Sequence, residues 1–154
     1  MVSITGNLIK FGVCTPELAK STKRWVDQNL TLDQIRANDW LFMAYRAYDY
    51  FMNVAEYPRL EEHRQAVLEN ISACAVTQAE KNETKKYYTL FMFAPTPESD
   101  VARAMPAGLI AQYLDHIETS QRDDGGWDDE HDLPYWQPYA SITSLLALKN
   151  FNRL

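Results

Sequence analysis

The sequence contains little glycine and little cysteine. Five glycines in 154 residues, with almost no alternation of polar and apolar residues, favour helices over strands and turns. The two cysteines, Cys14 and Cys74, stand far apart and form no CxxC pair. Such isolated cysteines are typical of reduced core residues in a cytoplasmic protein, which makes a disulfide framework or a zinc site unexpected.

Long apolar stretches are also missing. The longest unbroken apolar run covers residues 40–45, whereas a membrane-spanning helix needs roughly 20 such residues. Near the N-terminus a lone Lys10 precedes no apolar run and no small-residue cleavage pattern, so we expect no secretory signal and a cytoplasmic location.

Basic residues are outnumbered and form no stripe along the chain. The sequence has 15 Lys and Arg against 21 Asp and Glu, a net charge of −6. Residues 115–132 hold eight acids and one base, a charge of −7, so the remainder sums to +1. Binding to nucleic acid or to anionic membranes depends on clustered positive charge, so we expect neither partner.

The hydrophobic content, 46%, is that of a globular protein, and the length fits one domain over residues 1–154. Apolar spacing, capping residues and prolines predict an all-α fold. The expected helices cover residues 3–11, 16–29, 38–55, 58–77, 100–120 with a break at Pro106, and 139–150. Short connections between consecutive helices predict three αα-hairpins.

The expected helix 38–55 is apolar on nearly every side. Only Arg46, Asp49 and Asn53 form a polar stripe, which faces either solvent or an internal cavity. Such a helix needs cover on all sides, and three hairpins offer little. We therefore expect the chain to associate with other copies or with a further segment.

The strongest local motif is the heptapeptide Gln121-Arg122-Asp123-Asp124-Gly125-Gly126-Trp127. It resembles the Q-x-x-D-G-x-W repeat of terpenoid cyclase and protein prenyltransferase α-toroids, squalene-hopene cyclases included. The resemblance covers about residues 109–148 and implies part of an (α/α) toroid. It also implies a structural role for the motif residues Gln121, Asp124, Gly125, Gly126 and Trp127.

A short internal echo fits this resemblance. Ser3-Ile4-Thr5 with Leu8 aligns with Ser141-Ile142-Thr143 and Leu146 at a constant offset. If both open a repeat helix, the chain begins at the repeat position where it also ends. We expect either a homo-oligomer that completes the toroid or a missing N-terminal half.

The acidic string after the motif is the catalytic candidate. Asp128, Asp129 and Asp132 match the D-D-x-x-D pattern with which class I terpene synthases hold magnesium, a hard cation that takes oxygen ligands. The flanking Gly-Gly-Trp and Pro134 predict a loop instead, and a second metal motif is missing. The alternative is a solvated acidic loop, which binds a divalent cation at most weakly. No other metal or cofactor is expected.

Histidines offer no further chemistry. We expect His63 to be exposed on the polar side of its helix and His116 to pair with Asp115 or Glu118 at the surface. The third histidine, His131, lies among acids and has no nucleophile nearby in the sequence.

Aromatic residues supply the candidate ligand site. Their π-faces suit an isoprenoid chain or carbocation in a hydrophobic cavity, although simple core packing is the alternative. The candidate ligand-binding residues are Tyr45, Tyr48, Asp49, Tyr135, Trp136 and Tyr139. Two functions remain open: a terpenoid cyclase or prenyltransferase-like enzyme, and a non-catalytic toroid module that binds a hydrophobic small molecule or another chain.

Overall fold

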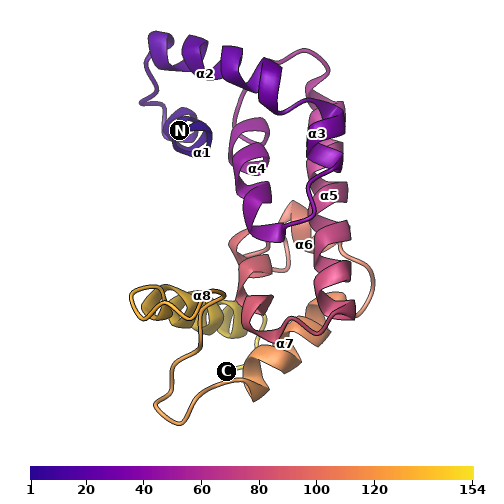
Figure 1. Ribbon diagram of the computed structural model, residues 1–154, viewed down its shortest axis with the longest axis vertical. Coiled ribbons are helices and arrows are strands. Elements are labelled where there is room, and N and C mark those ends of the chain that lie inside the picture. The colour runs from indigo at the N-terminus through magenta and orange to yellow at the C-terminus, as the bar shows by residue number, and fades with distance from the viewer. The chain divides into compact units, whose positions relative to one another are not determined.

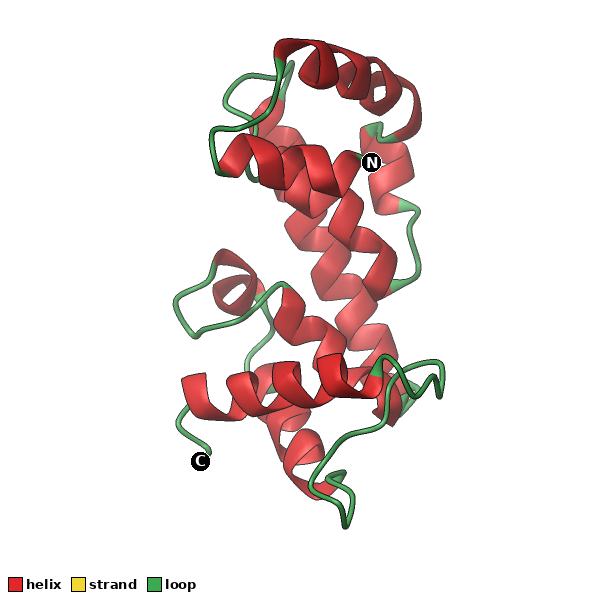
Figure 2. Ribbon diagram, turned by 90° about the vertical axis from the view of Figure 1, so that its left-hand side faces the viewer, coloured by secondary structure: helices red, strands yellow, loops and turns green.

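The computed structural model describes residues 1–154, with the exception of the Thr84 side chain. Within this description the chain is helical and contains no strand (Figure 2). It divides into two compact units, 1–71 and 72–154, and the helix α5 (Leu60–Glu80) runs through the boundary (Figure 1). None of the described helices is both long enough and apolar enough to cross a membrane.

The first unit begins with two helices that the sequence predicts well. Helix α1 (Val2–Lys10) is followed by Gly12 at a φ of +70°, a left-handed conformation that favours glycine. Thr15 caps α2 (Pro16–Asn29), because its side chain accepts a hydrogen bond from the backbone N–H of Leu18. Buried Thr5 and Thr22 share a 2.9 Å hydrogen bond that joins the two helices.

The sequence pattern missed one short helix in this unit. Helix α3 (Leu32–Arg36) starts with a capping box, in which Thr31 and Gln34 bond each other's backbone N–H groups. The spacing of Thr31 and Gln34 is the signal that could have predicted it.

The expected helix 38–55 was wrong in its extent. A 3₁₀ turn η1 (Leu41–Ala44) leads into α4 (Tyr45–Phe51), so regular α-helix covers only the middle of the predicted span. The chain also departs from purely sequential hairpins, because α1 packs mainly against α4 and less against α2. Gly6 permits this packing, since a Cβ there would lie 2.0 Å from the carbonyl oxygen of Asp49.

The second unit contains an aromatic-rich segment and the heptapeptide of residues 121–127. The segment Thr84–Met92 forms a 3₁₀ helix, η2, that buries Tyr87, Tyr88 and Phe91. The helices α6 (Asp100–Ala104) and α7 (Leu109–Thr119) lie on either side of Pro106, as the proline predicts. The last helix, α8 (Gln137–Asn150), packs against η2 and α7.

Candidate functional site

The heptapeptide of residues 121–127, which we call the Gln-Trp motif, forms a tight turn between α7 and α8. The Gln121 side chain donates a 2.9 Å hydrogen bond to the carbonyl oxygen of Gly125. Gly125 has a φ of +82°, which only glycine adopts readily, and its backbone N–H donates to the carbonyl of Arg122. The motif therefore fixes its own loop by local hydrogen bonds.

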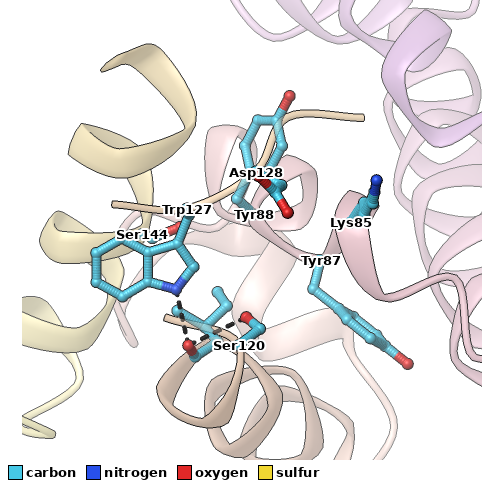
Figure 3. Close-up of a pocket in the computed structure, with 8 residues that line it drawn as sticks. Lys85, Tyr87, Tyr88, Ser120, Trp127, Asp128 and Ser144 are labelled. Atoms are coloured by element: carbon cyan, nitrogen blue, oxygen red, sulfur yellow. Dashed lines mark hydrogen bonds between the residues drawn. The ribbon is translucent and has the colours of Figure 1, made fainter. Parts of the chain in front are cut away.

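Trp127 connects this turn to both flanking helices (Figure 3). Its side chain is 4% exposed, and the indole N–H donates a 2.8 Å hydrogen bond to the carbonyl oxygen of Ile117 in α7. Its backbone N–H donates to Ser141 Oγ in α8 at 3.0 Å. Trp127 thus buries a large apolar ring, and its two N–H groups find hydrogen-bond acceptors in α7 and α8.

A small pocket lies beside Trp127. Its volume is about 120 Å³, and the residues that line it are Lys85, Tyr87, Tyr88, Ile117, Ser120, Trp127, Asp128 and Ser144 (Figure 3). Burial raises the pKa of Tyr88 to about 12, so its hydroxyl stays protonated well above physiological pH. Pockets for drug-sized ligands usually exceed ~300 Å³, so this one does not accommodate an isoprenoid chain.

The three aspartates of the acidic string each have a separate partner. Asp128 forms a 3.0 Å ion pair with Arg122, and exposed Asp132 forms one with Lys85. Asp129 is buried and accepts hydrogen bonds from the backbone N–H groups of His131 and Leu133. Asp129 therefore stabilises the loop. The acidic string lies in a loop, as the flanking Gly-Gly-Trp and Pro134 predict.

These aspartates do not converge on a common point. Among the described residues no group of three or more His, Cys, Asp or Glu side chains is placed to hold a metal ion. Arg122 also binds Asp124, and these two ion pairs hold the pKa of the Arg122 guanidinium above its usual range. Residues 128–132 therefore form a loop that ion pairs stabilise.

The aromatic candidates of the second unit lie together at the start of α8. The Tyr135 and Trp136 ring centroids are 6.4 Å apart, and those of Trp136 and Tyr139 are 5.6 Å apart. Tyr135 is 73% exposed, while Trp136 and Tyr139 are 40% and 39% exposed. They form a surface cluster at the N-terminal end of α8.

The candidates of the first unit have different surroundings. Tyr45 contacts Phe42, with ring centroids 5.4 Å apart, and Tyr48 is half-buried. Asp49 accepts a hydrogen bond from the Ser3 hydroxyl of α1, and burial raises the pKa of its carboxyl. Asp49 thus joins α1 to α4.

Two expectations about histidine were wrong. His63 is 7% exposed rather than solvated, because its ring stacks on Phe51 at 4.6 Å and bonds the Arg59 carbonyl through Nδ1. His116 packs against the Tyr87 ring at 4.4 Å, and this burial lowers its pKa. The expected partners of His116, Asp115 and Glu118, instead form ion pairs with Arg153.

The sequence did not reveal two features. One face at and just before α8 leaves large apolar side chains exposed, and they recur at helical spacing: Tyr135, Trp136, Tyr139, Ile142, Leu145 and Leu146. The other is the composition of a pocket in the first unit that Arg46 lines, since the sequence indicated a cavity beside Arg46 only as an alternative to solvent. The intervals of three and four between residues 135, 139, 142 and 146 could have revealed the first feature.

Comparisons with known proteins indicate no function, so a function has to be inferred from the structure itself. The chain matches no protein-family model, no curated protein and no solved structure.

Proposed function

We propose that this chain is a non-catalytic helical module of the α-toroid type that acts by association, with the exposed face of α8 binding the same face of a second copy. The observation that carries the proposal is the extent of that face. Its six large apolar side chains, two of them just before the 14-residue helix, are 39% to 73% exposed. Contiguous apolar patches of this kind mark interaction surfaces in folded proteins.

The distribution of charge along α8 favours an antiparallel pair. Residues 123–132 hold six acids, and the three bases that pair with them (Arg122, Lys85 and Lys86) leave a net charge of −3 beside the N-terminal end of α8. Exposed Lys149 lies at the opposite end of the helix. In an antiparallel pair, Lys149 of each copy approaches the acidic loop of the other. The arrangement that pairs the apolar faces therefore also pairs opposite charges.

The toroid resemblance supports the same function. Trp127 joins α7 to α8 through its hydrogen bonds to Ile117 and Ser141, and Gln121 closes the turn by its bond to Gly125, which suits a structural repeat motif. The echo between the two ends of the chain adds to this support, because Ile4 in α1 and Ile142 in α8 are 63% and 57% exposed at equivalent positions. Each helix of a toroid buries its apolar stripe against neighbouring helices, so an apolar face without a neighbour is what a partial toroid would present.

We expect the chain to be a dimer and Ile142→Asp to make it a monomer. The substitution places a charge in the centre of the apolar face, and we expect the dissociation constant to rise at least 100-fold, about 2.7 kcal/mol. Size-exclusion chromatography with light scattering measures the mass, and circular dichroism checks the helix content. Lys149→Glu should weaken the dimer less, by roughly tenfold, because it reverses only the charge contact.

The control is Leu154→Asp, which alters an apolar side chain that is 77% exposed and lies outside α8. It should leave the dimer intact. A wild-type chain that stays monomeric at all concentrations would contradict the proposal, and so would an Ile142→Asp variant that still dimerises.

The second candidate is a terpenoid cyclase or prenyltransferase-like activity on an isoprenoid. The contacting rings of Tyr135, Trp136 and Tyr139 favour it, since exposed aromatic faces can bind a prenyl chain. Incubation with prenyl diphosphates of several lengths, with and without magnesium, separates the two functions. We expect no turnover, because Asp128, Asp129 and Asp132 do not converge. Turnover that Asp128→Ala abolishes would establish the enzyme instead.

A further inference from the structure

A second pocket, which the α8 face does not involve, lies in the first unit. It has a volume of about 320 Å³ and is formed by the end of α2, by α3 and the chain after it, by η1 and α4, and by Asn70 of α5. The residues that line it are Asn29, Leu30, Gln34, Ile35, Ala37, Asn38, Met43, Ala44, Arg46, Ala47 and Asn70. All of them lie within residues 1–71, so the pocket belongs to one compact unit.

Arg46 is the one charged side chain among these lining residues. Its Nε is buried and has no hydrogen-bond partner. No described acid forms an ion pair with its guanidinium, whereas Arg36 pairs with Glu69 and Arg64 with Glu61 in the same unit. A half-buried cation without an anion is unfavourable, and an anionic ligand would relieve that cost.

The polar wall of the pocket consists of amide side chains that leave the positive charge unbalanced. Asn38 Nδ2 donates to Asn70 Oδ1 at 2.9 Å, and Asn70 Nδ2 donates to the Asn38 carbonyl at 2.7 Å. This reciprocal pair fixes both amides. The polar residues of α4 therefore have different surroundings. Asp49 accepts a hydrogen bond from Ser3 of α1, whereas Arg46 lines the pocket.

The remaining wall is apolar. Leu30, Ile35, Ala44 and Ala47 are buried, and Met43 completes the surface with a flexible side chain. A ligand that fits both walls has one anionic group for Arg46 and an aliphatic part for the other side. Because each water-sized atom occupies roughly 30 Å³, the pocket holds roughly ten non-hydrogen atoms.

We propose that this pocket binds a small aliphatic carboxylate, which forms paired hydrogen bonds with the Arg46 guanidinium while its chain lies against Leu30, Ile35 and Met43. Arginine presents a planar fork of donors that matches a carboxylate. A single cation neutralises the single charge of a carboxylate, whereas a phosphate dianion would retain unbalanced charge among neutral amides.

The test uses the full chain and three probes: octanoate, octan-1-ol and inorganic phosphate. Octanoate should shift the backbone amide resonances of Ala44 and Ala47 in ¹H–¹⁵N spectra and saturate. Octan-1-ol, which has the same chain without the charge, should bind at least tenfold more weakly, and phosphate should not displace octanoate. Equal binding of acid and alcohol would overturn the proposal, as would displacement by phosphate or shifts confined to Ile142 and its neighbours.

The variant Arg46→Met removes the charge and keeps the length of the side chain. We expect it to weaken octanoate binding at least tenfold, and Arg46→Lys to weaken it several-fold because the planar fork is lost. The matched control is Arg24→Met, at an exposed position of α2, which should bind octanoate within twofold of wild type. Unchanged binding by Arg46→Met would overturn the proposal. If that variant does not fold, the three probes on the wild-type chain decide.

Discussion

Gly6→Ala should destabilise the first unit by about 3 kcal/mol, the upper part of the range for overpacking a closely packed site. Gly6 lies in α1, and an added Cβ would meet three backbone atoms of α4: the Asp49 carbonyl oxygen at 2.0 Å, the Asp49 carbonyl carbon at 2.4 Å and the Tyr50 nitrogen at 2.8 Å. Backbone atoms cannot move aside as a side chain can. The two helices must separate, and the hydrogen bond between Ser3 of α1 and Asp49 of α4 weakens.

The sign of this effect distinguishes tertiary packing from local propensity. In an isolated helix, alanine is more favourable than glycine by about 1 kcal/mol, so propensity alone predicts a more stable protein. Chemical denaturation of both proteins measures the difference, and the Asp49 resonances report whether the Ser3 contact is lost.

Gly12→Ala is the control for the Gly6 variant. A methyl group added at Gly12 would have no neighbouring atom within 4 Å. Only the φ of +70° disfavours a residue other than glycine at this position. This substitution should therefore cost about 1 kcal/mol of conformational strain. Equal costs for Gly6→Ala and Gly12→Ala would contradict the close approach of α1 and α4.

The close approach of α1 and α4 also explains what the sequence could not predict in the first unit. Periodicity and caps predict α1, α2 and the Thr15 cap because those signals are local. The partner of α1 is a long-range choice, decided by the missing side chain of Gly6 against the backbone of Asp49. His63 was misplaced for the same reason, since its burial depends on Phe51 and Tyr57, which a helical wheel of α5 does not contain.

In the second unit the sequence motif predicted the turn but not the role of each acid. The glycines and Trp127 specify the loop through backbone conformation and burial, which a heptapeptide can encode. The spacing of Asp128, Asp129 and Asp132 equally suits a helical metal site, and only the loop conformation separates their carboxylates. The exposed face of α8 was not predicted, because apolar residues on the other side of the helix, such as Ala147 and Leu148, obscure the intervals of three and four that mark it.

Trp127→Ala should be the most destabilising change in the second unit, at about 4 kcal/mol. Replacing a buried tryptophan by alanine usually costs ~3–5 kcal/mol, because the apolar burial is lost and a cavity remains. Here the new cavity would merge with the 120 Å³ pocket beside the indole, so the site cannot collapse easily. Trp127→Phe should cost only about 1–2 kcal/mol, because the Ile117 carbonyl still accepts a hydrogen bond from Ser120 Oγ at 3.2 Å.

Two comparisons test whether Trp127 holds the motif together by burial. Trp25→Ala, at a tryptophan that is 39% exposed, should cost about 1 kcal/mol. Gln121→Ala removes one exposed hydrogen bond and should also cost about 1 kcal/mol. If Gln121→Ala lowered the free energy of unfolding as much as Trp127→Ala, the motif would depend on a cooperative set of hydrogen bonds. The indole would then contribute through its N–H rather than through its burial. The expected order places the stability of the α7–α8 junction in the buried indole ring rather than in the polar contacts of the turn.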